Sequence, residues 1–144
     1  MESALKRVFT LGTSTRSEED FVEILLFYGI STVVDVRSFP KSKIPTFTQA
    51  YLSDLLQREG LKYCFLGREL GGLRKGGYDA YTETDAFRLG VDRLEEIAAV
   101  STAVIICVER FPWKCHRRWI AREFHRRGWT IEHIIDKGKV WIPK

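Results

Sequence analysis

Apolar residues along the chain follow two spacings, and their alternation predicts strands and helices in turn. Short apolar or β-branched runs of strand length occupy residues 8–11, 32–36, 61–66, 103–108 and 129–135. Apolar residues recur at helical spacing over residues 17–28, 48–59, 84–99 and 116–127. The chain therefore reads as strand and helix by turns over most of its length.

Polar and glycine residues at the ends of these segments support the same reading. Ser17, followed by Asp20 three residues later, is typical of a capped helix start, and Gly29, Gly60 and Gly128 follow helical segments as stop signals. Residues 67–78 contain five glycines and no regular apolar spacing. We expect that stretch to form an irregular, mobile loop.

Alternating strands and helices predict right-handed crossovers and a mostly parallel sheet. The expected fold class is α/β, a three-layer open sheet with helices on both faces, Rossmann-like or flavodoxin-like. Residues 136–139 are suited to a turn, so residues 140–142 are expected to close a short C-terminal hairpin. We expect residues 1–144 to form a single domain.

The composition fits a soluble protein. The chain has 144 residues, of which 44% are hydrophobic, and no apolar run reaches the ~18 residues needed to span a bilayer. The first residues also lack a signal-peptide pattern, so we expect a cytoplasmic protein with no membrane partner. Three cysteines without paired spacing predict reduced thiols and no disulfide framework.

Positive charge is concentrated in one segment of the chain. The formal net charge is +4, yet residues 110–127 hold seven arginines and lysines and one acidic residue. This concentration predicts a local surface for an anionic partner, either a small molecule or a nucleic acid. The sequence gives no indication of the oligomeric state.

Unusual polar residues follow several of the predicted strands. In open parallel sheets, ligands bind beyond the carboxyl ends of the strands. That edge would collect the following candidate ligand-binding residues: Thr13, Ser14, Thr15, Arg16, Arg37, Gly71, Gly72, His116 and Arg117. We expect a pocket there for a phosphate-bearing or otherwise anionic ligand, such as a nucleotide or the end of a nucleic acid.

Two charged groups at this edge admit two interpretations each. Asp35 and Arg37 share one face of their strand, so they either pair with each other or serve a ligand. Arg117 points inward from its helix, because Ile120, Ala121 and Phe124 follow it at helical spacing. A buried cation there requires compensation by the carboxylate of Glu109 or Asp35, or by a bound anion.

Cys115 is the candidate nucleophile. It precedes a helix and adjoins His116 and several arginines, a setting that lowers the pKa of a thiol, although an inert thiol fits the position as well. Asp35 and Glu109 are the candidate groups for base chemistry or orientation. The residue six positions after Cys115 is Ala121 and not arginine, which excludes a phosphatase-type loop.

No metal and no cofactor are expected. His116, His125 and His133 lack the spacing of a zinc site. The run from Cys107 through Glu109 to Cys115 is too compact for a zinc deaminase and lacks its second cysteine pair.

The helix over residues 116–127 supports a second hypothesis. Arg118, Arg122 and Arg126 lie at i, i+4 and i+8, with Trp119 beside them. Arginines interleaved with aromatic rings suit phosphate contact and base stacking, so a noncatalytic nucleic-acid-binding module is the alternative function. An ordinary solvated helix face fits the same pattern.

Taken in order along the chain, these motifs resemble a known family. Residues 10–16 (TLGTSTR), 34–37 (VDVR) with Pro40, 70–72 (LGG), and 107–109 (CVE) with Pro112 and 115–117 (CHR) are similar to the prokaryotic domain of unknown function DUF488. The resemblance covers nearly the whole chain. Members usually carry histidine where this chain has Thr13, and the resemblance implies no particular reaction.

Overall fold

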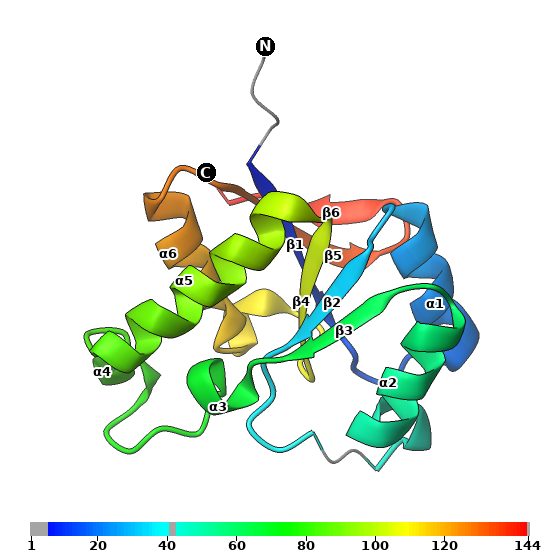
Figure 1. The fold of residues 1–144 in the computed structure, drawn as a ribbon, viewed down its shortest axis with the longest axis horizontal. Helices are drawn as coiled ribbons and strands as arrows, with labels where there is room; N and C mark the ends of the chain where they lie inside the picture. Colours follow the sequence, from blue (N-terminus) through cyan, green and yellow to red (C-terminus); the bar gives the residue numbers. More distant parts are fainter. Residues whose placement is uncertain (1–5, 41–42, 144) are drawn as a thin grey trace.

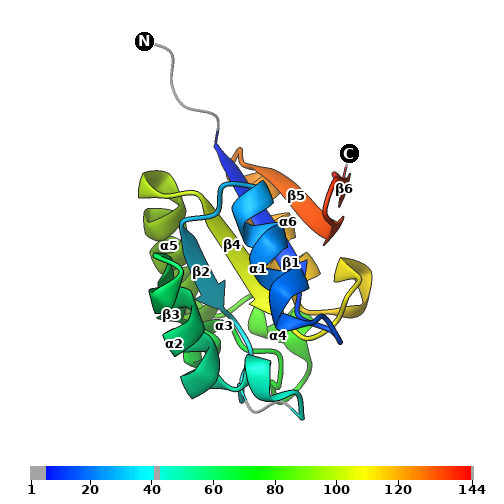
Figure 2. The ribbon, with the colours of Figure 1, turned by 90° about the vertical axis from the view of Figure 1, so that its right-hand side faces the viewer.

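The computed structural model describes residues 6–40 and 43–143, which form one twisted sheet flanked by helices (Figure 1). Its strands are β1 (Arg7–Gly12), β2 (Thr32–Asp35), β3 (Lys62–Phe65), β4 (Ala103–Cys107), β5 (Thr130–Asp136) and β6 (Lys139–Trp141). The strand order is β3-β2-β4-β1-β5-β6, and every neighbouring pair except β5–β6 is parallel. The mostly parallel α/β sheet and the C-terminal hairpin are confirmed, and Figure 2 shows β5 and β6 side by side at one edge.

Four of the helices begin and end close to the predicted positions, and two short ones, α3 (Gly67–Leu70) and α4 (Tyr78–Tyr81), were not predicted. The four are α1 (Glu18–Phe27), α2 (Gln49–Arg58), α5 (Asp85–Val100) and α6 (Arg117–Arg126), and short 3-10 turns lie at Pro45–Phe47 and Pro112–Lys114. The Ser17 side chain accepts a hydrogen bond from the Asp20 backbone and so caps α1. Thr84 caps α5 in the same way through Phe87. These caps satisfy amides that have no partner within the helix.

Helices cover both faces of the sheet. Alternate residues of β4 enter two separate cores, since Ile105 and Cys107 pack on the α3–α6 side and Val104 and Ile106 on the α1–α2 side. Figure 1 shows α5 and α6 on one side and α1 and α2 on the other. Because both faces are buried, the central strands are almost wholly apolar, as β4 illustrates with five buried residues.

Strand β4 lies between β1 and β2, although it comes later in the chain than both. The chain leaves β1 and β2 toward the face with α1 and α2, whereas it leaves β4 toward the face with α6. Neighbouring strands whose connections diverge to opposite faces leave a crevice beyond their carboxyl ends, and open α/β sheets bind ligands at such switch points. The loops that follow β1, β2 and β4 therefore meet at this position.

The stretch expected to be an irregular, mobile loop is instead partly helical and well anchored. It contains α3 and the start of α4, and the Arg74 side chain bonds to the carbonyls of Gly71 and Arg68. The same guanidinium lies 3.9 Å from the centroid of the Tyr81 ring. The number of glycines alone predicted mobility wrongly, because side-chain contacts such as those of Arg74 hold this segment in place.

No helix within the described part of the chain combines the length and apolar character that crossing a membrane requires.

Candidate functional site

A pocket of about 360 Å³ opens at the carboxyl end of the sheet, at the switch point next to β4. Its lining comes from the loops after β2 and α3 and from the loop and turn between β4 and α6. The lining residues are Arg37, Ser38, Phe39, Gly72, Leu73, Cys107, Val108, Glu109, Lys114, Cys115 and His116. Five of the sequence-based candidates thus meet in one pocket: Arg37, Gly72, Glu109, Cys115 and His116.

The loop after β4 is held against β1 by backbone contacts. The amides of Thr13 and Ser14 donate to the carbonyls of Cys107 and Val108, at 2.7 and 2.8 Å. Gly12 makes this approach possible, because a Cβ at that position would collide with the Glu109 carbonyl. The wall of the pocket therefore rests directly on the backbone that follows β1.

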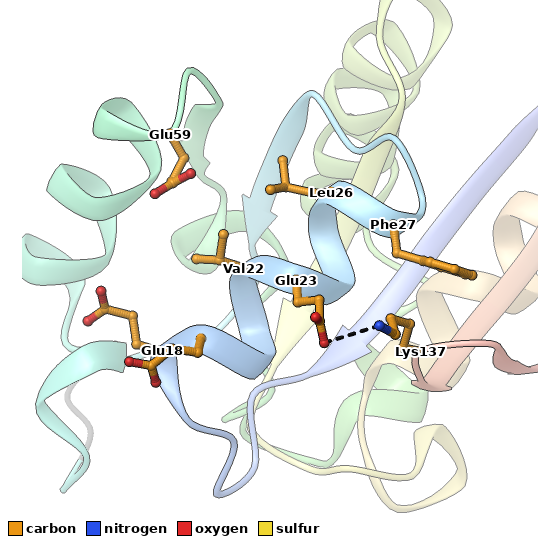
Figure 3. A pocket seen from close by; sticks show the side chains of 8 residues that line it. Glu18, Val22, Glu23, Leu26, Phe27, Glu59 and Lys137 are labelled. Atoms are coloured by element: carbon orange, nitrogen blue, oxygen red, sulfur yellow. Dashed lines mark ion pairs between the residues drawn. The ribbon is translucent and has the colours of Figure 1, made fainter.

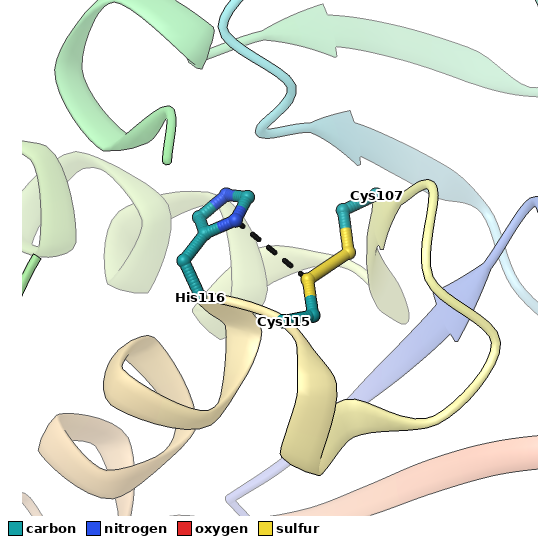
Figure 4. Close-up of side chains that lie close together, drawn as sticks. All are labelled: Cys107, Cys115 and His116. Carbon is teal, nitrogen blue, oxygen red and sulfur yellow. Dashed lines mark hydrogen bonds between the residues drawn. A yellow bond between two sulfur atoms is a disulfide. The ribbon is translucent and has the colours of Figure 1, made fainter. Parts of the chain in front are cut away.

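Cys107 and Cys115 are joined by a disulfide at the wall of the pocket (Figure 4). The expectation of reduced thiols is wrong for these two residues in this structure. Eight positions separate them, and the intervening turn brings the start of α6 back to the end of β4, which sequence spacing did not reveal. Cys64 is a free cysteine. Cys115 could act as a nucleophile only after reduction, since a disulfide sulfur carries no thiolate.

His116 sits against this disulfide. Its Nδ1 lies 3.6 Å from Cys115 Sγ, and its Nε2 lies 2.9 Å from the Val36 carbonyl oxygen. A carbonyl only accepts hydrogen bonds, so we place the ring proton on Nε2, which leaves a lone pair on Nδ1. Burial lowers the pKa of His116, and the nearby Arg117 and Arg74 charges lower it further, so the ring is neutral at pH 7.

Asp35 and Arg37 form a buried ion pair. Arg37 Nε donates to Asp35 Oδ1 at 2.8 Å and Nη2 to Oδ2 at 2.7 Å, while Nη1 donates to the Phe47 carbonyl. The Tyr63 hydroxyl completes the set by donating to Asp35 Oδ2. Of the two interpretations, the structural ion pair is the one observed. The proposed base role of Asp35 is not supported, because its carboxylate is fully engaged and does not line the pocket.

Arg117 is fully buried, as its inward orientation predicted. Its guanidinium bonds to neutral oxygens: the Thr10 hydroxyl at 3.1 Å and the Glu109 carbonyl at 2.6 Å, with the Arg110 carbonyl at 3.4 Å. Nε of Arg117 has no acceptor among the described residues. Burial, and then the Arg16 charge, lower the pKa of Arg117 to about 9, so the group is still a cation at pH 7.

The expected carboxylate partner of Arg117 is therefore missing among the described residues. Glu109 contributes its backbone carbonyl, and its carboxylate, on an exposed side chain, acts on the cation only at longer range. Asp35 is committed to Arg37. The first turn of α6 thus holds an uncompensated positive charge directly beneath the loop that forms the pocket wall.

The model of the domain of unknown function DUF488 matches residues 17–124. The chain belongs to the DUF488 family. Comparison with curated proteins gave no match, and comparison with solved structures gave none either. The matched range contains all the lining residues of the pocket.

Six predicted ligand residues of this DUF488 domain lie outside the pocket lining: Thr13, Ser14, Thr15, Arg16, Gly71 and Arg117. Arg16 is buried and bonds to the Asp136 carboxylate at 3.0 Å and to the Ile135 carbonyl at 2.6 Å. Asp136 also accepts two hydrogen bonds from Arg110. Arg16 therefore ties the β1 loop to the end of β5, a contact across 120 positions that local patterns do not show.

Two glycines at the pocket act by leaving space. A Cβ on Gly72 would lie 2.8 Å from His116 Nδ1, and one on Gly71 would collide with the Ser38 hydroxyl. Gly72 lines the DUF488 pocket and Gly71 packs behind it. Sequence analysis missed six other lining residues: Ser38, Phe39, Leu73, Cys107, Val108 and Lys114. The positions of Ser38 and Phe39 just after β2 would have identified those two.

Only part of the basic face of α6, formed by Arg118, Arg122 and Arg126, is free to contact an anionic partner. Arg126 is paired with Glu123, whereas the guanidinium groups of Arg118 and Arg122 lie 4.9 and 4.4 Å from the centroid of the Trp119 ring. Both of these arginines border a hollow of about 540 Å³ between α6 and the β5–β6 hairpin, which also contains Trp129. Of the three arginines predicted to form the nucleic-acid surface, only Arg118 and Arg122 are therefore free of a carboxylate partner among the described residues, and both lie close to Trp119.

A third hollow of about 640 Å³ lies between α1 and α2, on the opposite face of the sheet from α6 (Figure 3). Its acidic lining residues are Glu18, Glu19, Glu23 and Glu59, with Lys137 bonded to Glu23 at 3.3 Å. This composition repels anions. None of the sequence-based candidates lines it, and it does not belong to the candidate site of the DUF488 domain.

Sequence analysis missed a buried polar contact between Thr10 and His133, which lies next to the Arg117 guanidinium. Thr10 and His133 are register partners on β1 and β5, and Thr10 Oγ1 lies 2.6 Å from His133 Nδ1. Burial, together with the Arg117 charge, lowers the pKa of His133 to about 3, so we assign a neutral ring that accepts from the Thr10 hydroxyl. Arg117, Thr10 and His133 form a buried polar chain from α6 to β5 in this DUF488 fold.

Proposed function

We propose that the protein binds a phosphate-bearing or otherwise anionic ligand, such as a nucleotide or the end of a nucleic acid, in the pocket beside β4. The observation that carries the proposal is the buried Arg117 guanidinium, which has no carboxylate within ion-pair distance among the described residues. Buried cations are normally compensated within the protein. An anion held in the adjacent pocket would supply the missing charge.

Other groups around the pocket add to this positive potential. Lys114 lines the pocket, is exposed, and has no ion-pair partner among the described residues. Helix α6 begins directly at the pocket, so its dipole adds partial positive charge. The one acidic side chain in the lining is that of Glu109. Arg37 contributes little free charge because Asp35 neutralises it.

The test is a calorimetric titration with inorganic phosphate, a nucleoside monophosphate and a short 5′-phosphorylated oligonucleotide. We expect binding that Lys114→Glu weakens by about tenfold, equivalent to about 1.4 kcal/mol. Lys114 is the appropriate position because its exposed side chain can be reversed without disturbing the core. Changes at Arg37 or Arg117 would confound binding with stability, because both side chains are buried.

Lys62→Glu is the matched control, since Lys62 is an exposed lysine on edge strand β3, outside the pocket. It should leave the affinity unchanged. Absence of binding for all three probes at low salt, or equal weakening by both variants, would reject the pocket as the anion site.

The alternative of a noncatalytic nucleic-acid-binding surface keeps one specific observation in its favour. Arg118 and Arg122 flank the Trp119 ring and have no carboxylate partner among the described residues. Guanidinium groups beside an aromatic ring suit contact with a phosphate backbone and stacking with a base.

The two proposals separate by site. Fluorescence anisotropy of labelled single-stranded DNA, duplex DNA and RNA over a range of salt concentrations would measure binding to the surface of α6. Loss of binding in an Arg118→Glu, Arg122→Glu double variant, with Arg126→Glu unaffected, supports the surface. Arg126 is the control because Glu123 already neutralises it. Loss in Lys114→Glu alone supports the pocket.

A further inference from the structure

Three potential metal ligands converge at the wall of the pocket. Cys107 Sγ, Cys115 Sγ and one ring nitrogen of His116 all lie within 4.8 Å of one another. The His116 nitrogen that faces the sulfurs is Nδ1, 3.6 Å from Cys115 Sγ. Figure 4 shows the His116 ring turned toward the disulfide that joins Cys107 and Cys115. Two sulfurs and one imidazole nitrogen are a donor set that zinc prefers.

The protonation pattern of His116 suits a ligand role. Its Nε2 donates to the Val36 carbonyl at 2.9 Å, which fixes the ring orientation and leaves the Nδ1 lone pair directed toward the sulfurs. Metal-binding histidines almost always donate their second ring N–H to a carbonyl, carboxylate or water. The bond to Val36 therefore serves as the outer contact that such a histidine requires.

We propose that, once the Cys107–Cys115 disulfide is reduced, Cys107 Sγ, Cys115 Sγ and His116 Nδ1 bind one zinc ion whose fourth coordination position opens to the pocket. Reduction takes two electrons from an external dithiol, which becomes a disulfide and supplies two protons, or from a phosphine, which becomes a phosphine oxide while water supplies the oxygen and both protons; either route yields two thiols. Binding of Zn²⁺ then displaces both thiol protons and forms two Zn–S bonds. This site stands whether or not the pocket binds an anion.

The backbone around these ligands leaves room for an ion. The Cα atoms of Cys107 and Cys115 are 7.6 Å apart, wider than the roughly 4.4–6.8 Å that usually accompanies a disulfide. Gly72 leaves further space, because a Cβ there would lie 2.8 Å from His116 Nδ1. Gly72 has no positive φ, so its lack of a side chain is explained by this approach and not by the backbone.

The proposed site has three protein ligands, and this number has a chemical consequence. Structural zinc sites normally have four protein ligands, whereas sites with three keep an open position for water or substrate. The open position would face a pocket that contains Glu109 and Lys114. The reduced protein would thus present a zinc-bound water or anion, and the oxidised protein would not. The expectation of no metal rested on the spacing of the ligands along the chain. Seven residues separate Cys107 from Cys115, and His116 follows directly, which is not the spacing of a common zinc motif.

The test uses Co²⁺ as a spectroscopic substitute for zinc. The full-length protein is reduced with a phosphine, freed of reductant under anaerobic conditions and titrated with Co²⁺. We expect one equivalent to give thiolate-to-cobalt charge-transfer and tetrahedral bands, and we expect Zn²⁺ to abolish them. The oxidised protein should give neither. A reduced protein without these bands would overturn the proposal.

Variants assign the ligands. Cys107→Ser and Cys115→Ser should abolish the charge-transfer bands, while Cys64→Ser should retain them. His116→Gln should weaken Co²⁺ binding by more than about 100-fold, because loss of an outer contact alone costs about 10–100-fold. His125→Gln, an exposed histidine on the same helix, is its control. Bands that survive Cys107→Ser, or that disappear in Cys64→Ser, would contradict the assignment.

Gly72→Ala keeps all three ligands and provides a second test. The added methyl group would crowd His116 Nδ1, so Co²⁺ affinity should fall while the circular dichroism spectrum stays that of the wild type. Unchanged affinity in both Gly72→Ala and His116→Gln would exclude His116 from the site and so overturn the proposed ligand set.

Discussion

Arg37 holds Asp35 with two parallel hydrogen bonds at the end of β2, and both side chains are almost completely buried. A bidentate pair of this kind is strong only while both partners are present, because removal of one leaves an uncompensated charge in the interior. The pair therefore fixes the backbone from which Arg37, Ser38 and Phe39 reach the pocket.

Asp35→Asn should lower the free energy of unfolding by about 3–5 kcal/mol, because Arg37 stays charged and buried. Urea denaturation followed by circular dichroism measures this change. Asp54→Asn is the matched control: Asp54 pairs with Arg58 on the exposed side of α2 and should cost less than about 1 kcal/mol. Equal losses in the two variants would contradict the role assigned to Asp35.

Gly12→Ala should destabilise the protein through the pocket wall. A Cβ at Gly12 would collide with the Glu109 carbonyl and approach Arg110 Cα to 2.8 Å, so the loop after β4 must move. Overpacking of this kind typically costs about 1–3 kcal/mol. We expect a lower urea midpoint together with weaker binding of anions and Co²⁺, and a variant that loses stability while both affinities stay unchanged would show that the wall does not depend on this contact.

Acid should destabilise the protein well above the pH at which carboxylates titrate. The pKa of His133 is about 3 in the folded protein, against an ordinary value near 6.5 in the unfolded chain. Below pH 6.5 the unfolded chain therefore binds a proton that the folded protein does not. The free energy of unfolding should fall by up to about 1.4 kcal/mol per pH unit as pH decreases from 6.5.

Urea midpoints measured between about pH 7 and pH 4.5 check this slope. His133→Gln should reduce it, because glutamine can still accept from the Thr10 hydroxyl but takes up no proton. Burial also lowers the pKa of His116, so that ring contributes to the slope that remains. His125→Gln, which changes an exposed ring, should leave the slope as it is. The carboxyl groups of Glu95, Glu123 and Asp136 have lowered pKa values and contribute only in more acidic solution. An unaltered slope in His133→Gln would refute the assignment.

Two adjacent arginines at the end of α6 should differ in their importance for stability. Arg127 bonds to Glu123, Asp92 and Glu95, so it links α6 to α5, and its side chain is 19% exposed. Arg126 pairs with Glu123 alone and is 71% exposed. We expect Arg127→Ala to lower the free energy of unfolding by about 1–3 kcal/mol and Arg126→Ala to lower it by less, because solvent screens an exposed ion pair; urea midpoints measure both changes. A larger loss for Arg126→Ala would reverse this ranking and contradict it.

Local signals predicted the elements well, because caps and apolar spacing act within a few residues. The Ser17 cap and the five apolar residues of β4 are examples. The strand order could not be predicted in the same way, since a helical connection does not reveal how many strands it crosses. The insertion of β4 between β1 and β2 therefore emerged only from the structure.

Sequence analysis identified the loops that form the candidate site, but it identified few of the hydrogen-bond and ion-pair partners within it. Asp35 and Arg37 are two residues apart and so share one face of the strand, and this spacing allowed their pairing to be predicted as one possibility. The contacts of Arg16 with Asp136 and of Thr10 with His133 join positions more than a hundred residues apart, and no local pattern could indicate them. Glu109 was chosen for its carboxylate, yet its backbone carbonyl binds Arg117, which side-chain chemistry does not predict.

The central place of β4 has a consequence for how the protein is made. A ribosome releases β1, β2 and β3 before β4. Strands β1 and β2 do not pair with each other, because each pairs with β4, which begins at Ala103. Until that strand emerges, the nascent chain exposes two unfilled sheet edges. Because β4 ends in Cys107, the residue that closes this gap also delivers the first sulfur of the pocket. The sheet and the site thus both depend on segments that emerge late, from β4 to β5, so a chain truncated before β4 would have neither.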